Sequence, residues 1–118
     1  MIVSNIIGGL GNQMFQYAAS LAVVRKSGAQ LKLDTSNFQG YELHHGYELS
    51  RVFDIDTPIA SPAEVEGILG WKRCSLIRKL CRRFFKGMAQ SNYIIEPSFT
   101  YWPNVYQLSD MVYLEGYW

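Results

Sequence analysis

The feature of this chain that most restricts its fold is a glycine turn between a short apolar run and a helical pattern. Residues Ile2 to Ile7 predict a short buried strand, and the turn Gly8-Gly9-Leu10-Gly11 follows it directly. Gln13 to Ser27 has the pattern of a helix, Gly28 is a suitable C-cap, and Gln30 to Asp34 predicts a second strand. This order of strand, helix and strand predicts a βαβ unit of an α/β fold.

The first predicted helix carries few polar side chains. Gln13, Gln16, Ser20 and Ser27 fall on one narrow stripe of the helical wheel, and apolar side chains take most of the remaining girth. A helix that is apolar around most of its girth is usually buried on several sides. We therefore expect this helix to be buried on more than one side.

Further elements follow without a linker, so residues 1–118 are expected to form one domain. Ser61-Pro62-Ala63-Glu64 predicts a helix start, with Ser61 as N-cap, Pro62 at the first position and Glu64 closing a capping box. That helix is expected to end between Gly67 and Gly70. Two more strands are predicted, at Tyr93 to Glu96 and at Met111 to Glu115.

Composition excludes several classes of protein. Apolar residues make up 48% of the chain and charged residues 18%, which is typical of a globular domain rather than a disordered one. The net charge of +1 argues against a strongly basic nucleic-acid binder. No apolar run approaches the ~20 residues of a membrane span, and the N-terminus does not resemble a secretory signal. Cys74 and Cys81 lack a neighbouring His or Cys cluster, which favours reduced thiols in a cytoplasmic protein over a zinc site.

Residues 72–86 form the clearest amphipathic pattern, with one apolar and one basic face. Arg82, Arg83 and other cations on the basic face could contact an anionic membrane surface, with Phe84 and Phe85 at the acyl boundary. A surface helix whose apolar half packs on the sheet and whose basic half is solvated explains the same pattern. The second interpretation is the simpler one, and the first stays open.

The glycine turn has two interpretations. Glycines before a helix N-terminus let a ligand approach the backbone closely, and the helix dipole favours an anion such as phosphate. Gly9-Leu10-Gly11 matches the first half of a dinucleotide fingerprint, and Asp34 stands about where a ribose-binding acid is expected, but Met14 replaces the third glycine. The alternative is a tight turn with no ligand role.

Other polar residues carry weaker signals. Asn12 and Gln13 are neutral amides at the helix start, which can both donate to and accept from sugar hydroxyls, although Asn12 could equally be an N-cap. His44 and His45 lie in a polar loop without the spacing of metal ligands. No paired carboxylates and no nucleophile elbow are evident, so the residues alone give no complete catalytic constellation.

The segment from Gly8 to Ala18, GGLGNQMFQYA, resembles the N-terminal motif of the α-1,2-fucosyltransferases of glycosyltransferase family 11. The segments LKLDTSNF, His45 to Ile55 and VYLEGYW near the chain end resemble later stretches of the same family in the same order. The resemblance implies inverting, metal-independent transfer of L-fucose from GDP-fucose to the 2-hydroxyl of a terminal galactose, without a cofactor. It also implies two Rossmann-like domains facing each other across a cleft, an arrangement of the GT-B type.

Carried onto this sequence, the resemblance places Gly9, Gly11, Asn12 and Gln13 near the fucose and the acceptor hydroxyl. The family's His-x-Arg-Arg-x-Asp stretch has no match in this chain, so the chain is expected to be a fragment without the C-terminal GDP-fucose-binding domain and inactive by itself. We expect its last strand, MVYLE, to lack neighbours. His44, His45, Asp34 and Glu48 are the candidates for the base. A non-catalytic nucleotide- or dinucleotide-binding βαβ module is the alternative function.

Overall fold

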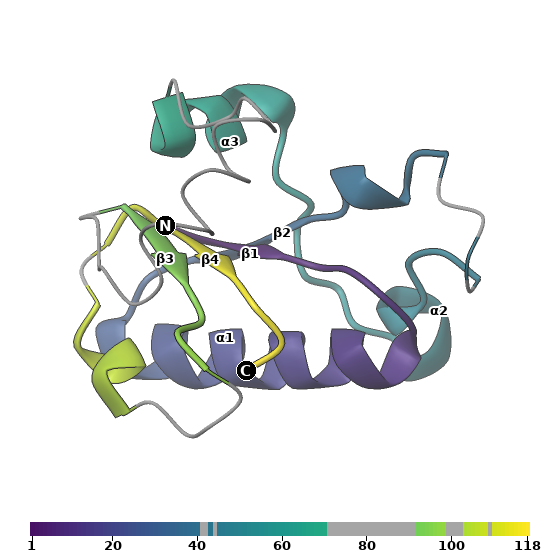
Figure 1. The fold of residues 1–118 in the computed structure, drawn as a ribbon, viewed down its shortest axis with the longest axis horizontal. Helices are drawn as coiled ribbons and strands as arrows, with labels where there is room; N and C mark the ends of the chain where they lie inside the picture. The colour runs from purple at the N-terminus through teal and green to yellow at the C-terminus, as the bar shows by residue number, and fades with distance from the viewer. Residues whose placement is uncertain (41–42, 44, 71–91, 99–102, 109) are drawn as a thin grey trace.

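A computed structural model describes residues 1–118 except 41–42, 44, 71–91, 99–102 and 109. Its described strands form one four-stranded sheet in the order β2-β1-β4-β3, and every neighbouring pair is parallel (Figure 1). The elements are β1 (Ile2–Asn5), α1 (Leu10–Ser27), β2 (Leu31–Asp34), η1 (Ser36–Phe38), α2 (Leu49–Phe53), α3 (Pro62–Leu69), β3 (Tyr93–Ile95), η3 (Pro103–Gln107) and β4 (Val112–Glu115). The predicted α/β class with a Rossmann-like βαβ unit is confirmed.

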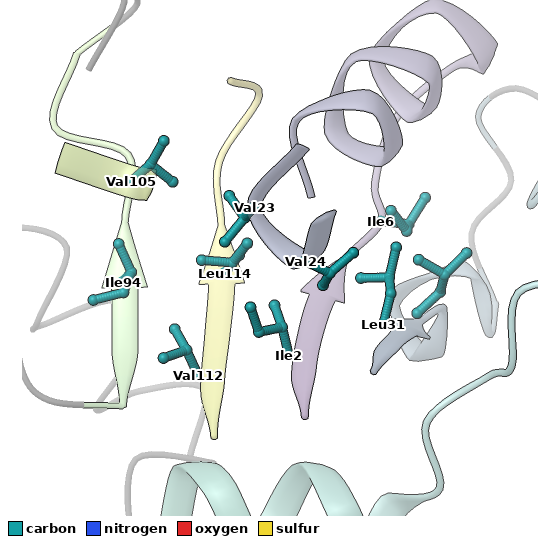
Figure 2. Close-up of a cluster of buried hydrophobic side chains, with 10 residues drawn as sticks. Ile2, Ile6, Val23, Val24, Leu31, Ile94, Val105, Val112 and Leu114 are labelled. Atoms are coloured by element: carbon teal, nitrogen blue, oxygen red, sulfur yellow. The ribbon is translucent and has the colours of Figure 1, made fainter. Parts of the chain in front are cut away.

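Helices cover both faces of the sheet, with α1 on one side and α3 on the other (Figure 1). The α1 side holds the larger core, in which Val23 and Val24 of the helix pack with Ile2, Leu31 and other aliphatic side chains of all four strands (Figure 2). The α3 side holds a smaller core built on Ile68, Leu69 and the strand tyrosines. Because both faces of the sheet are covered, consecutive strand residues such as Ile2 and Val3, or Val112, Tyr113 and Leu114, are all buried.

The last strand occupies an inner position. β4 pairs with β1 through Ile2 and Val112 and with β3 through Tyr93 and Tyr113, and each of its residues is buried. The expectation that this strand lacks neighbours is therefore wrong. A strand near the end of the chain is placed centrally because parallel strands need not neighbour one another in sequence order.

The orientation of α1 also differs from the prediction. Gln13, Gln16 and Ser20 of the polar stripe are fully buried against the sheet side, whereas Phe15 is 66% exposed and Met14 is 45% exposed. The expectation that α1 is buried on several sides because of its apolar girth is therefore wrong. Gln13 and the Gln16 Oε1 find hydrogen-bond partners in turn and loop backbone, and the Ser20 hydroxyl bonds to Ser4 and to the Gln16 carbonyl. These bonds offset the loss of water.

Two of the local signals at helix ends are confirmed, at the start of α3 and at the end of α1. Ser61 caps α3, and its hydroxyl accepts a hydrogen bond from the Glu64 N–H while Glu64 bonds back to the Ser61 N–H, completing the predicted capping box. Gly28 ends α1 in the left-handed conformation at φ +71°. Among the described residues, no helix is long and apolar enough to cross a membrane. The basic segment 72–86, with Cys74 and Cys81, lies outside the described residues, so its membrane contact stays a prediction.

Candidate functional site

The glycine turn leads from β1 straight into α1, three residues earlier than predicted. Gly9 is the N-cap, with no side-chain cap bond, so Gly11 and Asn12 belong to the first helical turn and Asn12 is not the N-cap. Gly8 adopts φ +79°, and a Cβ there would lie 2.6 Å from the Asn12 amide nitrogen. Glycine is favoured at this position because other residues rarely adopt this φ, and a larger residue would also displace the exposed Asn12 amide.

Gln13 fastens the turn to a distant loop. Its amide nitrogen donates to the carbonyl oxygens of Gly8 at 2.9 Å and Gly46 at 2.8 Å, and its Oε1 accepts from the Glu48 N–H at 2.9 Å. The side chain is fully buried. Since its amide is engaged on both sides, Gln13 holds the backbone of the turn in place rather than facing an open surface.

The next turn of α1 continues this polar contact with β1. Gln16 Oε1 accepts from the Ile7 N–H at 3.0 Å, while no described residue accepts from its buried Nε2. The Ser20 hydroxyl lies 2.7 Å from the Ser4 hydroxyl and 2.7 Å from the Gln16 carbonyl. Directional bonds of this kind fix the distance and rotation between helix and strand more tightly than apolar contact does.

A cavity of about 420 Å³ opens beside the start of α1 at the carboxyl end of the sheet. That end of a parallel sheet is where ligands of α/β proteins bind, and the volume falls in the range of about 300–1,000 Å³ that is usual for small-molecule sites. Two residues from α1 and three that follow β3 and β4 line it: Asn12, Phe15, Glu96, Tyr117 and Trp118. An amide, a carboxylate and aromatic rings around one cavity suit a polar ligand with apolar faces, such as a sugar.

The structure adds Glu96 to the candidate residues, which sequence reasoning treated only as the end of a strand. Its Oε2 accepts from the Tyr117 N–H at 2.7 Å, so the carboxylate joins the segments after β3 and β4. An acid as the last residue of a predicted strand was the only signal that could have pointed to it. The sequence did not show that β3 pairs with β4, which brings Glu96 to Tyr117.

None of the three base candidates that the structure describes lines this cavity. His44 lies outside the described residues, and His45 is exposed in the loop. Both oxygens of Asp34 are engaged, with Oδ1 accepting from the Ser36 N–H at 2.9 Å and Oδ2 from the Tyr113 hydroxyl at 2.6 Å. Glu48 forms an ion pair with Arg51.

Asp34 instead lines a second cavity of about 370 Å³, next to α3. Among the described residues no group of three His, Cys, Asp or Glu side chains could hold a metal ion. Of the predicted substrate-binding residues, Asn12 lines the first cavity, and Gly9 and Gly11 belong to the turn beside it. The Gln13 side chain does not line the cavity and instead bonds to the backbone of that turn and of the loop at Gly46 and Glu48. Contact of these four residues with substrate stays a prediction.

The chain is similar over part of its length to a known transferase. Over 65 residues, which are 55% of this chain, it is 38% identical to an alpha-1,2-colitosyltransferase of Escherichia coli. The matched residues cover 22% of that protein, so the match spans about a fifth of the relative's length. No protein-family model and no solved structure matches this chain.

Proposed function

We propose that this chain is the N-terminal, acceptor-binding part of an α-1,2-fucosyltransferase that transfers L-fucose from GDP-fucose to the 2-hydroxyl of a terminal galactose. Two lines of support agree on the linkage. The segment from Gly8 to Ala18 resembles the fucosyltransferase motif, and the E. coli relative is named for an α-1,2 transfer of colitose. They differ in the transferred sugar, so the donor is the less constrained half of the proposal.

The observation that carries the proposal is the cavity between Asn12, Glu96 and the aromatic rings of Phe15 and Trp118. Asn12 sits in the first turn of α1, where backbone N–H groups and the helix dipole favour negative charge. In an inverting transfer the departing diphosphate gains negative charge while the acceptor oxygen attacks the anomeric carbon. An amide that both donates and accepts can orient that oxygen.

Gly11 fits a close approach of substrate to the helix start. A Cβ at this position would meet no atom within 4 Å, so packing within the described residues does not require glycine there. A bound sugar or phosphate near the first turn would supply such a requirement. The arginine expected to neutralise the diphosphate belongs, in this proposal, to a C-terminal domain beyond these residues.

The first test is sugar binding by the 118-residue chain, followed by saturation-transfer difference NMR. Methyl β-D-galactoside should give saturation transfer in the wild type. Asn12→Ala should weaken binding about tenfold, as expected for loss of hydrogen bonds in a partly enclosed site. Gln39→Ala is the matched control, because Gln39 is an exposed amide that lines the other cavity. Absence of galactoside binding in the wild type would refute the proposal.

The alternative nucleotide-binding module makes an opposite prediction in a titration with NAD, GDP and GDP-fucose. Tighter binding of NAD than of either guanine nucleotide would favour it. Asp34 weighs against this alternative, because both its oxygens are already engaged by Ser36 and Tyr113. A ribose would have to displace one of these partners.

A test of fucosyl transfer itself begins with the encoding DNA, which shows whether a longer protein can be produced and assayed. An open frame beyond the Trp118 codon that contains His-x-Arg-Arg-x-Asp would allow the longer protein to be assayed with GDP-fucose and a galactoside. We expect transfer from that protein and none from the 118-residue chain. Transfer by the 118-residue chain alone would refute the proposed division of the site between two domains.

A further inference from the structure

Glu96 is held in a fixed place between two strands. Its own N–H donates to the Glu115 carbonyl at 2.9 Å, which continues the β3–β4 ladder. Its Oε2 accepts from the Tyr117 N–H at 2.7 Å. Glu96 is therefore held at two points, through its backbone N–H and through its carboxylate. Both partners are backbone groups of the segment that forms and follows β4, so the sheet sets the position of the carboxylate.

Gly116 makes this position available. A Cβ at Gly116 would lie 2.4 Å from the Cβ of Glu96 and 3.0 Å from its Oε2. Contacts this short do not occur between real side chains, so any larger residue would push the carboxylate away from the Tyr117 N–H. The glycine thus serves the placement of Glu96, which is a role distinct from the positive φ of Gly8.

The carboxylate retains capacity to bind a ligand. An ionised carboxylate can accept about four hydrogen bonds, and among the described residues only the Tyr117 N–H donates to it. Glu96 is half-buried and lines the cavity with Phe15 and Trp118. A group placed this way can accept from a ligand hydroxyl at little cost in side-chain entropy, because the sheet has already ordered it.

The charge of Glu96 indicates whether it lies beside the nucleotide-sugar donor or beside the acceptor sugar. A carboxylate repels the negatively charged diphosphate of a nucleotide sugar, whereas a neutral acceptor sugar brings only hydroxyl donors. The positive end of the α1 dipole lies on the Asn12 side of the same cavity. The cavity therefore has one side that favours an anion and one side that favours neutral hydroxyl groups.

We propose that the Glu96 carboxylate accepts the hydrogen bond of the acceptor hydroxyl that is to be glycosylated, and that Gly116 and the Tyr117 N–H hold it there. This inference rests on the proposed function, since it identifies the acceptor group at the same cavity. It makes Glu96 the residue that selects a galactoside with its 2-hydroxyl over one that lacks it.

The test compares the binding of two ligands to wild type and to Glu96 variants, with dissociation constants from saturation-transfer titrations of the 118-residue chain. Wild type should bind methyl β-D-galactoside about tenfold more tightly than the 2-deoxy analogue, since hydrogen bonds to charged groups discriminate by roughly that factor or more. In Glu96→Ala the two ligands should bind within about twofold of each other. Glu96→Gln, which keeps shape, should reduce the preference at least threefold and covers the case in which Glu96→Ala does not fold.

Glu66→Gln is the matched control, because Glu66 is exposed on α3 on the opposite face of the sheet, and it should keep the full tenfold preference. Equal binding of the two ligands by wild type, or an unchanged preference in a folded Glu96 variant, would overturn the assignment of Glu96 alone. No binding of either galactoside by wild type would instead overturn the proposed function. The two failures are therefore separated by whether the parent galactoside binds.

Discussion

The two halves of α1 meet the same sheet by different means. Toward its N-terminus, the buried face consists of Gln13, Gln16 and Ser20. The two amides bond to the backbone of the turn and loops, and the Ser20 hydroxyl bonds to the Ser4 side chain of β1. Toward its C-terminus, Val23 and Val24 pack into the aliphatic core (Figure 2). The polar half adjoins the candidate cavity, and the apolar half lies away from it.

The difference shows how one helix can both border a candidate site and anchor the hydrophobic core. Aliphatic packing stabilises the fold in proportion to buried area but does not specify direction. Hydrogen bonds contribute about 1 kcal/mol each in net terms, yet they are costly to leave unmade and demand defined angles. In the proposed function the glycine turn presents Asn12 to a ligand, and holding the turn in place for this needs the second kind of contact.

The largest effect should follow from removing aliphatic volume in the packed half. Leu31→Ala is expected to lower the free energy of unfolding by about 3 kcal/mol, because it leaves a cavity among buried side chains next to Val24. Urea unfolding of the 118-residue chain measures this loss. Phe15→Ala, on the exposed side of the same helix, should change stability by less than about 0.5 kcal/mol. Comparable losses in the two variants would show that α1 buries its other face.

A smaller loss of stability, with a larger local effect, should follow from breaking the polar half. Gln13→Leu is expected to cost about 2 kcal/mol, because it keeps the volume but leaves three backbone groups, partly or fully buried, without their partner. Hydrogen exchange at the Glu48 amide should accelerate more than exchange in β1. Gln39→Leu, at an exposed amide, is the control. Uniform acceleration across the chain would mean that Gln13 contributes only to global stability.

The same contrast explains what the sequence could predict. The capping box of Ser61 and Glu64 and the C-cap at Gly28 were predicted correctly because their partners lie within a few residues. The buried face of α1 was not predicted, because Gln13 is satisfied by Gly46 and Glu48, which only the folded chain brings near it. A hydrophobic pattern cannot show where a buried amide will find its partners.

The candidate site shows the same limit. Gly9, Gly11 and Asn12 could be selected because the turn, the helix start and the motif are contiguous in sequence. Glu96 could not, since its link to Tyr117 depends on β3 and β4 being neighbours, and strand order is a tertiary property. Base candidates chosen by residue type alone, such as Asp34 and Glu48, proved to have other partners.

The smallest effect should come from a polar contact that water can reach. Glu64 bonds to Lys32 and to Ser61, and these bonds lower its pKa from 4.5 to about 2, the bond to Lys32 having the largest effect. Because the folded pKa lies below the unfolded one, ionised Glu64 stabilises the fold above about pH 4.5, and this contribution disappears as the pH falls toward 2. The difference in unfolding free energy between wild type and Glu64→Gln should therefore be constant near neutral pH and shrink on acidification.

Acid titrations of stability in urea measure that difference, and a Lys32→Met background serves as the control. Removing Lys32 removes the hydrogen bond that lowers the Glu64 pKa most, so in this background the pH dependence of the Glu64→Gln difference should be weaker. If the difference in unfolding free energy between wild type and Glu64→Gln does not vary between pH 6 and 2, the contact between Glu64 and Lys32 contributes nothing to stability. Side chains of this contact are 19% and 31% exposed, whereas Gln13 is fully buried. The two variants together therefore measure how burial scales the value of a hydrogen bond in one fold.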